Sequence, residues 1–263
     1  MSQKQDLTRE RPIRLVNTSL RTLIDRERDN LQKETHFHVR KRKVIAEFLK
    51  KEANRHSAAI ELPNGVTLEG RQALDYKTQA LVQAHNYLCI HYVDELDKKL
   101  IFETWSLIEP DIQIKKFRNP DTDGFSFANA MGRTYPRDMH GELDYFIAEN
   151  NSIDNPLDRA LHAHFHIARI HPFLDGNGRL ARLIQNVILV DGNYTPIIID
   201  PKDRKDYLDL ICKAQNSYDD AERKMTKPQT AFYDFLAMNL FNSLREARKL
   251  VEHKTETIKI KYK

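Results

Sequence analysis

The sequence predicts an all-α fold, a bundle of helices around one core with a small β-hairpin beside it. Apolar residues recur at spacings of three and four in several stretches, which is typical of amphipathic helices. Glycine is scarce, at 8 of 263 residues. Strand-like alternation is confined to a segment near 125–135 and to 257–262, which we interpret as a tail or an edge strand. With 40% hydrophobic residues, the chain can bury one substantial core.

The helices are expected in three consecutive parts of the chain. Residues 1–50 are charged, and their sparse apolar positions predict an N-terminal helical extension. A main domain follows at 51–245. It begins with leucines that repeat every seven residues between 74 and 88, a pattern that predicts one long helix, and it ends with an amphipathic helix at 232–244. Residues 246–263 are interpreted as a C-terminal tail.

The segment His-Pro-Phe-Leu-Asp-Gly-Asn-Gly-Arg-Leu-Ala-Arg at 171–182 concentrates the residues that can perform chemistry. Gly176 and Gly178 flank Asn177, and glycines can adopt the positive φ angles that turn successive N–H groups toward one point. The apolar spacing after these glycines predicts a helix that starts here, and a helix N-terminus attracts anions. The segment therefore predicts a cradle for phosphate groups.

Charged and titratable residues surround this cradle. Arg179 and Arg182 are three residues apart, so both guanidinium groups can reach one polyanion. Asp175 would repel phosphate by itself, which suggests a bridging cation, and Mg²⁺ binds in this way through one carboxylate and substrate phosphates. His171 can act as a neutral base that accepts the proton of an attacking hydroxyl.

The segment resembles the Fic motif, HPFx[D/E]GNGRxxR, at every specified position. Residues 163–170 before it and 194–204 after it are similar to the usual flanks of this motif, and the resemblance extends roughly over residues 57–220. It implies the Fic fold, a helical bundle with a β-hairpin flap, for the catalytic domain. It also implies transfer of AMP from ATP to a Ser, Thr or Tyr hydroxyl of a target protein, with release of pyrophosphate.

The resemblance assigns a role to each residue of the motif. His171 would deprotonate the target hydroxyl, and Asp175 would hold Mg²⁺ against the α- and β-phosphates of ATP. Such transfer depends mainly on positioning and charge neutralisation, which these residues can supply. A lysine replaces the second glycine in the branch of the family that phosphorylates, and this chain has glycine there. The phosphate-binding residues would be Gly176, Asn177, Gly178, Arg179 and Arg182, the last at the γ-phosphate.

An upstream segment, Ser57-Ala58-Ala59-Ile60-Glu61, is similar to the inhibitory [S/T]xxxE[G/N] helix of the same family. There the glutamate pairs with the second arginine of the motif and takes the place of the γ-phosphate. Glu61 and Arg182 would form this pair, which places the chain in the N-terminally inhibited class. Leu62 departs from the Gly or Asn of the pattern, and an ordinary surface glutamate remains the alternative for Glu61.

Two further regions follow from the resemblance. The flap, with arms at 125–127 and 133–135, would align the target protein by strand addition, which selects an extended segment rather than one sequence. Tyr207 and Gln215 would contact the adenine base, although packing in the core is an equal alternative for the tyrosine.

His162 and His166 are four residues apart and would share a helix face, as zinc ligands on a helix do. The glutamate of the H-E-x-x-H motif is absent, because Ala163 follows the first histidine. Zinc hydrolysis is therefore not expected, and His164 and His166 are interpreted as packing residues.

Composition bounds the location and the partners of the protein. No stretch approaches a membrane span and the start lacks an apolar signal segment, so we expect a cytoplasmic protein without a membrane partner. The net charge of +4 is modest, and the basic run at 38–43 is interpreted as a solvated helix face rather than a nucleic-acid site. The expected partner is a target protein with a hydroxyl side chain. Whether the chain also forms a homo-oligomer is left open.

Three other functions stay open at this stage. Because the cradle recognises phosphates and only weakly the base, another nucleotide or phosphate-containing group could be transferred. Glu61 could instead position water that removes AMP from a modified target. The chain could also be a nucleotide-dependent regulatory binding module, although such a module has no use for the base His171.

Overall fold

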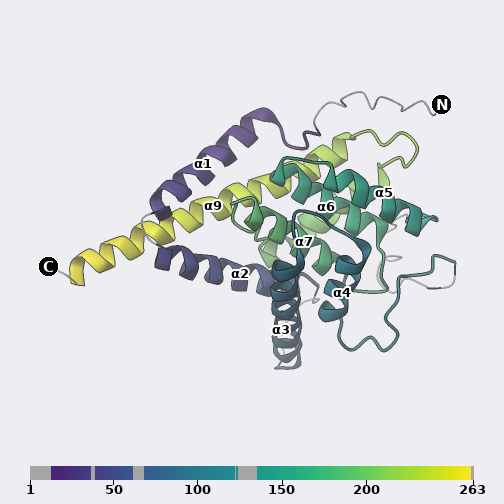
Figure 1. The fold of residues 1–263 in the computed structure, drawn as a ribbon, viewed down its shortest axis with the longest axis horizontal. Helices are drawn as coiled ribbons and strands as arrows, with labels where there is room; N and C mark the ends of the chain where they lie inside the picture. Colours follow the sequence, from purple (N-terminus) through teal and green to yellow (C-terminus); the bar gives the residue numbers. More distant parts are fainter. Residues whose placement is uncertain (1–12, 37–38, 62–67, 122, 124–134, 262–263) are drawn as a thin grey trace, which may run out of the picture.

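The computed structural model describes residues 13–36, 39–61, 68–121, 123 and 135–261, and most of this range is helical (Figure 1). The all-α class is confirmed for the described residues, in which the only β-pairing is an isolated bridge between Val93 and Glu95. The predicted flap falls outside the described residues except for Tyr135. The elements are α1 (Thr18–His36), α2 (Val39–Glu61), α3 (Leu68–His91), α4 (Lys98–Ile108), α5 (Met139–Asn151), α6 (Pro156–Ile170), α7 (Asn177–Asp191), a 3₁₀ turn η2 (Pro201–Asp203), α8 (Arg204–Asn216) and α9 (Lys227–Lys261).

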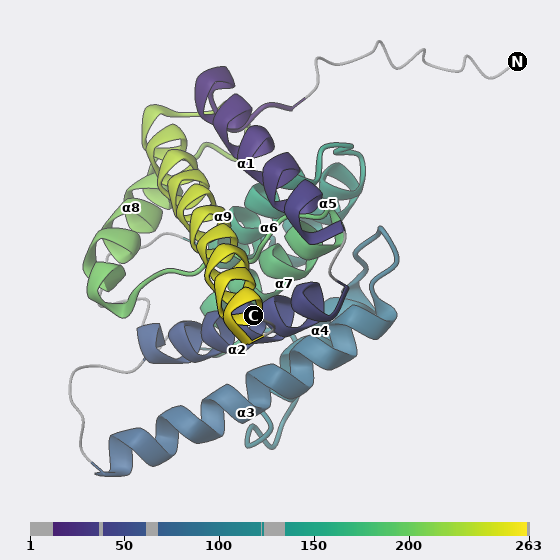
Figure 2. The ribbon, with the colours of Figure 1, turned by 90° about the vertical axis from the view of Figure 1, so that its left-hand side faces the viewer.

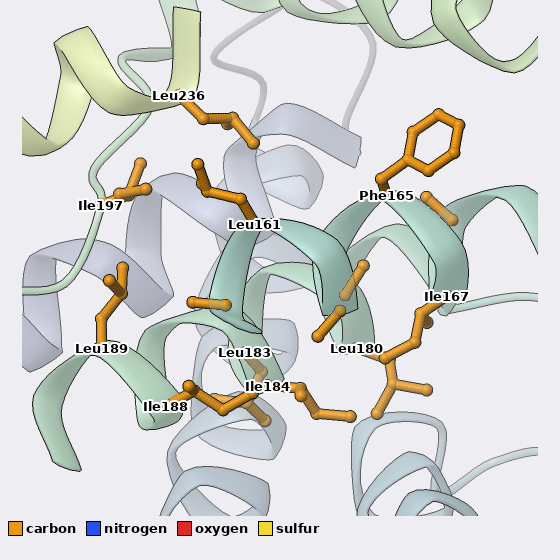
Figure 3. Packing of buried hydrophobic residues seen from close by; sticks show 14 of the residues in the cluster. Leu161, Phe165, Ile167, Leu180, Leu183, Ile184, Ile188, Leu189, Ile197 and Leu236 are labelled. Atoms are coloured by element: carbon orange, nitrogen blue, oxygen red, sulfur yellow. The ribbon is translucent and has the colours of Figure 1, made fainter. Parts of the chain in front are cut away.

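Helices α6 and α7 form the centre of the bundle. From Leu157 to Ile170 nearly every residue of α6 is buried, and α7 is buried from its first residue onward except at a few positions. A helix that is buried all round must be covered by other helices on every side. Figure 3 shows Leu161 of α6, Ile184 of α7 and Leu236 of α9 in this shared core. The loop between the two central helices is therefore held from both ends.

The start and end of α6 follow from its sequence. The side chain of Asn155 accepts hydrogen bonds from the N–H groups of Leu157 and Asp158, at 3.0 and 3.2 Å, and Pro156 occupies the first helical position. The helix ends at His171, which adopts a left-handed conformation with φ 53° and ψ 58°. This conformation turns the chain out of the helix and into the loop that begins the motif.

The C-terminal helix α9 is the longest element, with 35 residues, and it runs beside α1 in both views (Figures 1 and 2). The expectation of an edge strand at 257–262 is wrong for the described residues of this segment, because α9 continues as a helix to Lys261. Extending an existing helix by one turn costs far less than starting a new element, and the interspersed lysines are good helix formers. A short alternating pattern therefore did not determine the structure.

The N-terminal part contains α1 and most of α2. Helix α2 passes through the expected boundary at residue 50 without interruption and ends at Glu61, so residues 57–61 are its last turn. None of the helices described here has both the length and the apolar character that a membrane crossing demands.

His85 on α3 provides a test of the packing. Burial, aided by the charge of Lys50, lowers the pKa of His85 to about 4 from its ordinary 6.5. In the unfolded chain, His85 binds a proton as pH falls below 6.5, whereas in the folded protein it does so only near pH 4. The free energy of unfolding therefore decreases as pH falls from 6.5 to about 4. Between pH 7 and pH 5 this costs about 2 kcal/mol of unfolding free energy.

We expect His85→Leu to reduce the loss of stability between pH 7 and pH 5 by about that amount, because leucine cannot bind the proton. Urea unfolding of the wild type and the variant at pH 7 and pH 5 measures the change in unfolding free energy. An equal loss in the two proteins would contradict the assignment.

Candidate active site

The backbone at His171 is held by Arg118, which is almost fully buried. The guanidinium of Arg118 donates to the carbonyl oxygens of His171 and Ile170, at 2.9 and 3.3 Å. The backbone N–H of Arg118 donates to the carbonyl oxygen of Pro172 at 2.8 Å. These bonds satisfy carbonyls that the end of α6 leaves unpaired. The ring of His171 lies 4.9 Å from the ring of Tyr135, between centroids. Sequence analysis missed Arg118, because it lies 53 residues away with no local motif.

Aromatic residues hold the loop that follows. The ring of Phe173 stacks on Trp105 at 4.1 Å with an angle of 3°, and Phe117 lies on it at 5.1 Å. The indole N–H of Trp105 donates to the backbone carbonyl of Asp175 at 2.8 Å. The amide of Asn177 closes the loop by bonding both the N–H and the carbonyl of Phe173, at 3.0 and 2.7 Å. The side chain of Asn177 thus shapes the loop that leads into α7.

Both glycines of the motif lie where a side chain would collide. Gly176 has φ +80° and precedes the first residue of α7, and a Cβ atom there would lie 2.8 Å from the carboxylate of Glu109. A Cβ atom at Gly178 would lie 2.8 Å from the carboxylate of Glu61. Two glutamates from distant parts of the chain therefore approach the N-terminus of α7. Carboxylates are favoured at this position by the same N–H groups that bind phosphate.

Arg182 and Glu61 form the ion pair expected from the sequence, with an N–O distance of 2.5 Å. Ser57 supports the same guanidinium through its hydroxyl oxygen at 2.9 Å and its carbonyl at 3.1 Å. Burial would raise the pKa of Glu61, but the charge and hydrogen bond of Arg182 outweigh burial and hold this pKa below its ordinary value. The pair fastens the last turn of α2 to the first turns of α7.

Arg179 has a second carboxylate partner that sequence analysis missed. Its guanidinium forms an ion pair with Glu109, the residue after the end of α4, and lies 3.4 Å from Asp175. Burial raises the pKa of Glu109, and the charge of Arg179 opposes this shift. Arg179 is 1% exposed, yet its Nε and Nη1 atoms have no hydrogen-bond partner among the described residues. A buried guanidinium with two nitrogen atoms that lack a hydrogen-bond partner is suited to bind an anion.

Asp175 is the one predicted site residue of the loop with an exposed side chain, at 64%. One carboxylate oxygen accepts the N–H of Gly176 at 2.7 Å. The other lies near Arg179, at the edge of the cradle. A carboxylate that is exposed beside an anion site fits the requirement for Mg²⁺, which binds through few protein ligands and keeps water and phosphate in its coordination shell.

Tyr207 and Gln215, the two residues expected to contact the adenine base, differ in their surroundings. The hydroxyl of Tyr207 lies 2.9 Å from Nε2 of buried His164 and accepts from Arg182 at 3.2 Å, so this tyrosine joins the polar network behind the cradle. Gln215 is 3% exposed, and its amide nitrogen and oxygen have no partner in the described part of the chain. An unpaired buried amide is costly, which makes Gln215 a candidate contact for a polar ligand.

The structure thus brings together the residues of the motif with Ser57, Glu61 and Tyr207, across more than 100 residues of sequence. The arrangement combines a histidine at the end of one buried helix with two arginines in the first turns of the next. It is suited to bind a polyphosphate and to deprotonate a hydroxyl beside it.

Part of this sequence is similar to known proteins. Residues 87–189 match the model of the Fic/DOC family. The "Protein adenylyltransferase Fic" of Nematostella vectensis is 26% identical over 145 residues, which are 55% of this chain and 33% of that protein. The protein of the same name from Drosophila persimilis is 42% identical over 64 residues, 24% of this chain and 13% of its own. The chain thus spans a third or less of the length of these relatives.

Solved structures share the fold. A Fic domain containing signaling protein from Bacteroides thetaiotaomicron has a TM-score of 0.65 and 22% identity, and the match covers 90% of this chain and 97% of that one. Fic-1 from C. elegans has a TM-score of 0.61 and 18% identity, with 90% of this chain and 72% of that chain covered.

Proposed function

This chain belongs to the Fic/DOC family through residues 87–189, and on this premise we propose that it transfers AMP from ATP to a hydroxyl side chain of a target protein. The relatives named protein adenylyltransferase support the activity. The observation that carries the proposal is the buried guanidinium of Arg179, with two idle donors, at the start of the helix that follows His171. The free donors can bind a further anion, and a histidine at the end of the preceding helix can accept a proton.

In the proposed reaction, His171 accepts the proton of the target hydroxyl. The hydroxyl oxygen attacks the α-phosphorus of ATP, the bond between this phosphorus and the oxygen that bridges to the β-phosphate breaks, and pyrophosphate leaves. His171 is placed for this role because it ends α6 in a left-handed turn and Arg118 holds its carbonyl. Fixing the base beside the reacting phosphate supplies much of the rate enhancement in such reactions.

The phosphates would lie at the N-terminus of α7. Its free N–H groups and Arg179 offer positive charge without the cost of reorganising solvent. Asp175 would hold Mg²⁺, which supplies further neutralisation of the phosphate charge when it is bound. Gln215 would donate to and accept from the edge of the adenine base, because its amide has both a donor and an acceptor without a partner.

Glu61 would hold this activity low. Its carboxylate occupies the guanidinium of Arg182 and lies against Gly178, where the γ-phosphate is expected. A nucleotide that binds productively must replace this carboxylate, and a charge-assisted bond of 2.5 Å between partly buried groups opposes the exchange. We infer that the target protein, or another partner that moves α2, relieves the inhibition.

Incubation with ATP labelled at either the α- or the γ-phosphate, with Mg²⁺, tests the proposal. Wild type and Glu61→Gly are compared, with Gly178→Ala as a control that fills the cradle beside Glu61. We expect label on protein only from α-labelled ATP, and most of it in Glu61→Gly. Label from the γ-phosphate would show kinase-like transfer instead. ATP binding without any label in Glu61→Gly would favour a regulatory binding module.

Glu109 gives a separate prediction. In the Glu61→Gly protein, Glu109→Gln is expected to lower the Kd for ATP by about 10-fold, because it removes one negative charge beside the phosphates, worth about 1.4 kcal/mol. Glu109→Asp keeps the charge and should leave the Kd within about twofold of its starting value. Calorimetric titration with ATP and Mg²⁺ measures both. Weaker binding in Glu109→Gln would mean that Glu109 holds Arg179 in position and does not compete with the nucleotide.

A further inference from the structure

A second group of ligand-type side chains lies between α5 and α6. It consists of Glu149, His162 and His166, and one ligand atom from each lies within 4.8 Å of the other two. Nε2 of His162 is 2.9 Å from a carboxylate oxygen of Glu149, and the two imidazole rings are 4.2 Å apart between centroids. Both histidines are buried, with 4% and 3% exposure. The group is separate from the residues proposed for transfer.

The set matches the coordination chemistry of borderline divalent metals. Two imidazoles and one carboxylate are a common donor set for Zn²⁺, with bonds of about 2.0–2.2 Å and ligand atoms about 3.4 Å apart in tetrahedral geometry. His162 and His166 lie four residues apart on one face of α6, as helical zinc ligands do. The third ligand comes from α5. Inspection of α6 alone could not reveal it, because Glu149 lies 13 residues before His162.

The atoms behind the ligands are already held in place. The hydroxyl of Tyr145 donates to the second carboxylate oxygen of Glu149 at 3.2 Å. The amide of Asn150 lies 3.1 Å from Nδ1 of His162. Metal ligands are usually oriented by hydrogen bonds on their far side, in which a ligating histidine donates its second ring N–H, and Asn150 is the residue placed to be the partner of His162.

Two buried polar atoms at this group have no hydrogen-bond partner among the residues described, namely Nδ1 of His166 and Oδ1 of Asn150. Metal binding would give Oδ1 of Asn150 a hydrogen-bond partner. Coordination through Nε2 of His162 moves the ring proton to Nδ1, which then needs an acceptor, and rotation of the Asn150 amide presents Oδ1 for this purpose. The rotation gives up the 2.9 Å bond from Asn150 to the carbonyl of Arg159, so it occurs only when the metal contributes more than this bond.

The surrounding charges leave Glu149 available. Arg169 and Arg223 are the neighbouring cations, and both bind Glu142, at 2.5 and 2.6 Å. Arg169 also pairs with Asp220 at 2.5 Å. These two arginines and two acids balance each other, and the carboxylate of Glu149 lies 2.9 Å from Nε2 of His162 within the same group.

We propose that Glu149, His162 and His166 bind one divalent transition-metal ion of the Zn²⁺ class and so fasten α5 to α6. The remaining coordination position would be filled by water. The site would be structural, because it stiffens the helix that ends at His171 without reaching the cradle. The proposal does not depend on AMP transfer and is tested without an activity measurement.

The test is titration of the chelator-treated full chain with Zn²⁺, in competition with a chromophoric chelator, and with Co²⁺ followed by visible absorption. We expect one equivalent of Zn²⁺, ligand-field bands with Co²⁺, and a higher melting temperature with Zn²⁺. Glu149→Gln and His166→Gln should each weaken binding by at least about 10-fold. His56→Gln is the matched control, because it removes a partly buried histidine of α2 that lies 3.5 Å from Glu52 and outside the proposed site.

Glu149→Gln keeps the test decisive even if His166→Gln unfolds, since Glu149 is only half-buried and glutamine keeps its size. Circular dichroism confirms that each variant is folded. Zn²⁺ affinity that is unchanged in a folded Glu149→Gln protein, or a wild type that binds no stoichiometric Zn²⁺, would overturn the proposal.

Discussion

Replacing His171 is expected to lower AMP transfer by about 10²–10⁴-fold, because the hydroxyl then loses its general base. The assay uses the Glu61→Gly protein, in which transfer is measurable, and α-labelled ATP. The affinity for ATP should change by less than about twofold, because the imidazole acts on the hydroxyl and not on the phosphates. A large drop in rate with unchanged binding is the result that distinguishes a base from a binding residue.

The choice of substitution follows from the backbone. His171 has a φ of 53°, and alanine in this left-handed conformation costs roughly 1 kcal/mol, whereas asparagine tolerates it. His171→Asn should therefore keep the loop while removing the base, and His171→Ala serves as the second variant. If His171→Asn retains more than about a tenth of the transfer rate, the assignment of the base is wrong.

Releasing Glu61 is expected to raise AMP transfer by at least about 10-fold, which corresponds to the loss of one charge-assisted bond of about 1.5–3 kcal/mol. Glu61 is the last residue of α2, so Glu61→Gly does not interrupt a helix. It leaves the buried guanidinium of Arg182 without its carboxylate, so we expect some loss of stability, and circular dichroism confirms that the variant is folded. Ser57→Ala removes only the neutral contact to Arg182, at 2.9 Å, and should raise transfer much less. Initial rates with α-labelled ATP measure the series, and equal rates in all three proteins would contradict inhibition by Glu61.

The pH dependence of this inhibition has a definite sign. The pKa of Glu61 is held below its ordinary 4.5, although burial acts in the opposite direction, because Arg182 favours the ionised form. The pair is therefore fully present above pH 4.5 and is lost only as pH falls below this value. Mild acidification from pH 7 to pH 5.5 should not increase the rate of the wild type relative to that of Glu61→Gly.

Sequence analysis could predict the features of the site that depend on local spacing. Gly176 and the apolar positions after it predict where α7 begins, because positive φ and helical periodicity are properties of neighbouring residues. The contact between Glu61 and Arg182, 121 residues apart, followed only from the resemblance to a known motif. Local physics by itself gives no reason to connect these two residues.

The remaining features depend on which helices pack together. Glu109 reaches Arg179 because α4 ends beside the start of α7, and Arg118 reaches His171 across the same region. Neither residue belongs to a sequence motif, so neither could be assigned in advance. Tyr207 likewise contacts His164 and Arg182 because α8 packs against α9 and α6.

The central claim is that nucleotide phosphates bind at the start of α7. Calorimetric titration with ATP and Mg²⁺ tests it most directly when Glu61→Gly is compared with Glu61→Gly/Arg179→Ala. We predict that removing Arg179 weakens ATP binding by at least about 30-fold, because two charge-assisted hydrogen bonds are lost. Equal ATP affinity in the two folded proteins would contradict the account, because it would place the phosphates elsewhere.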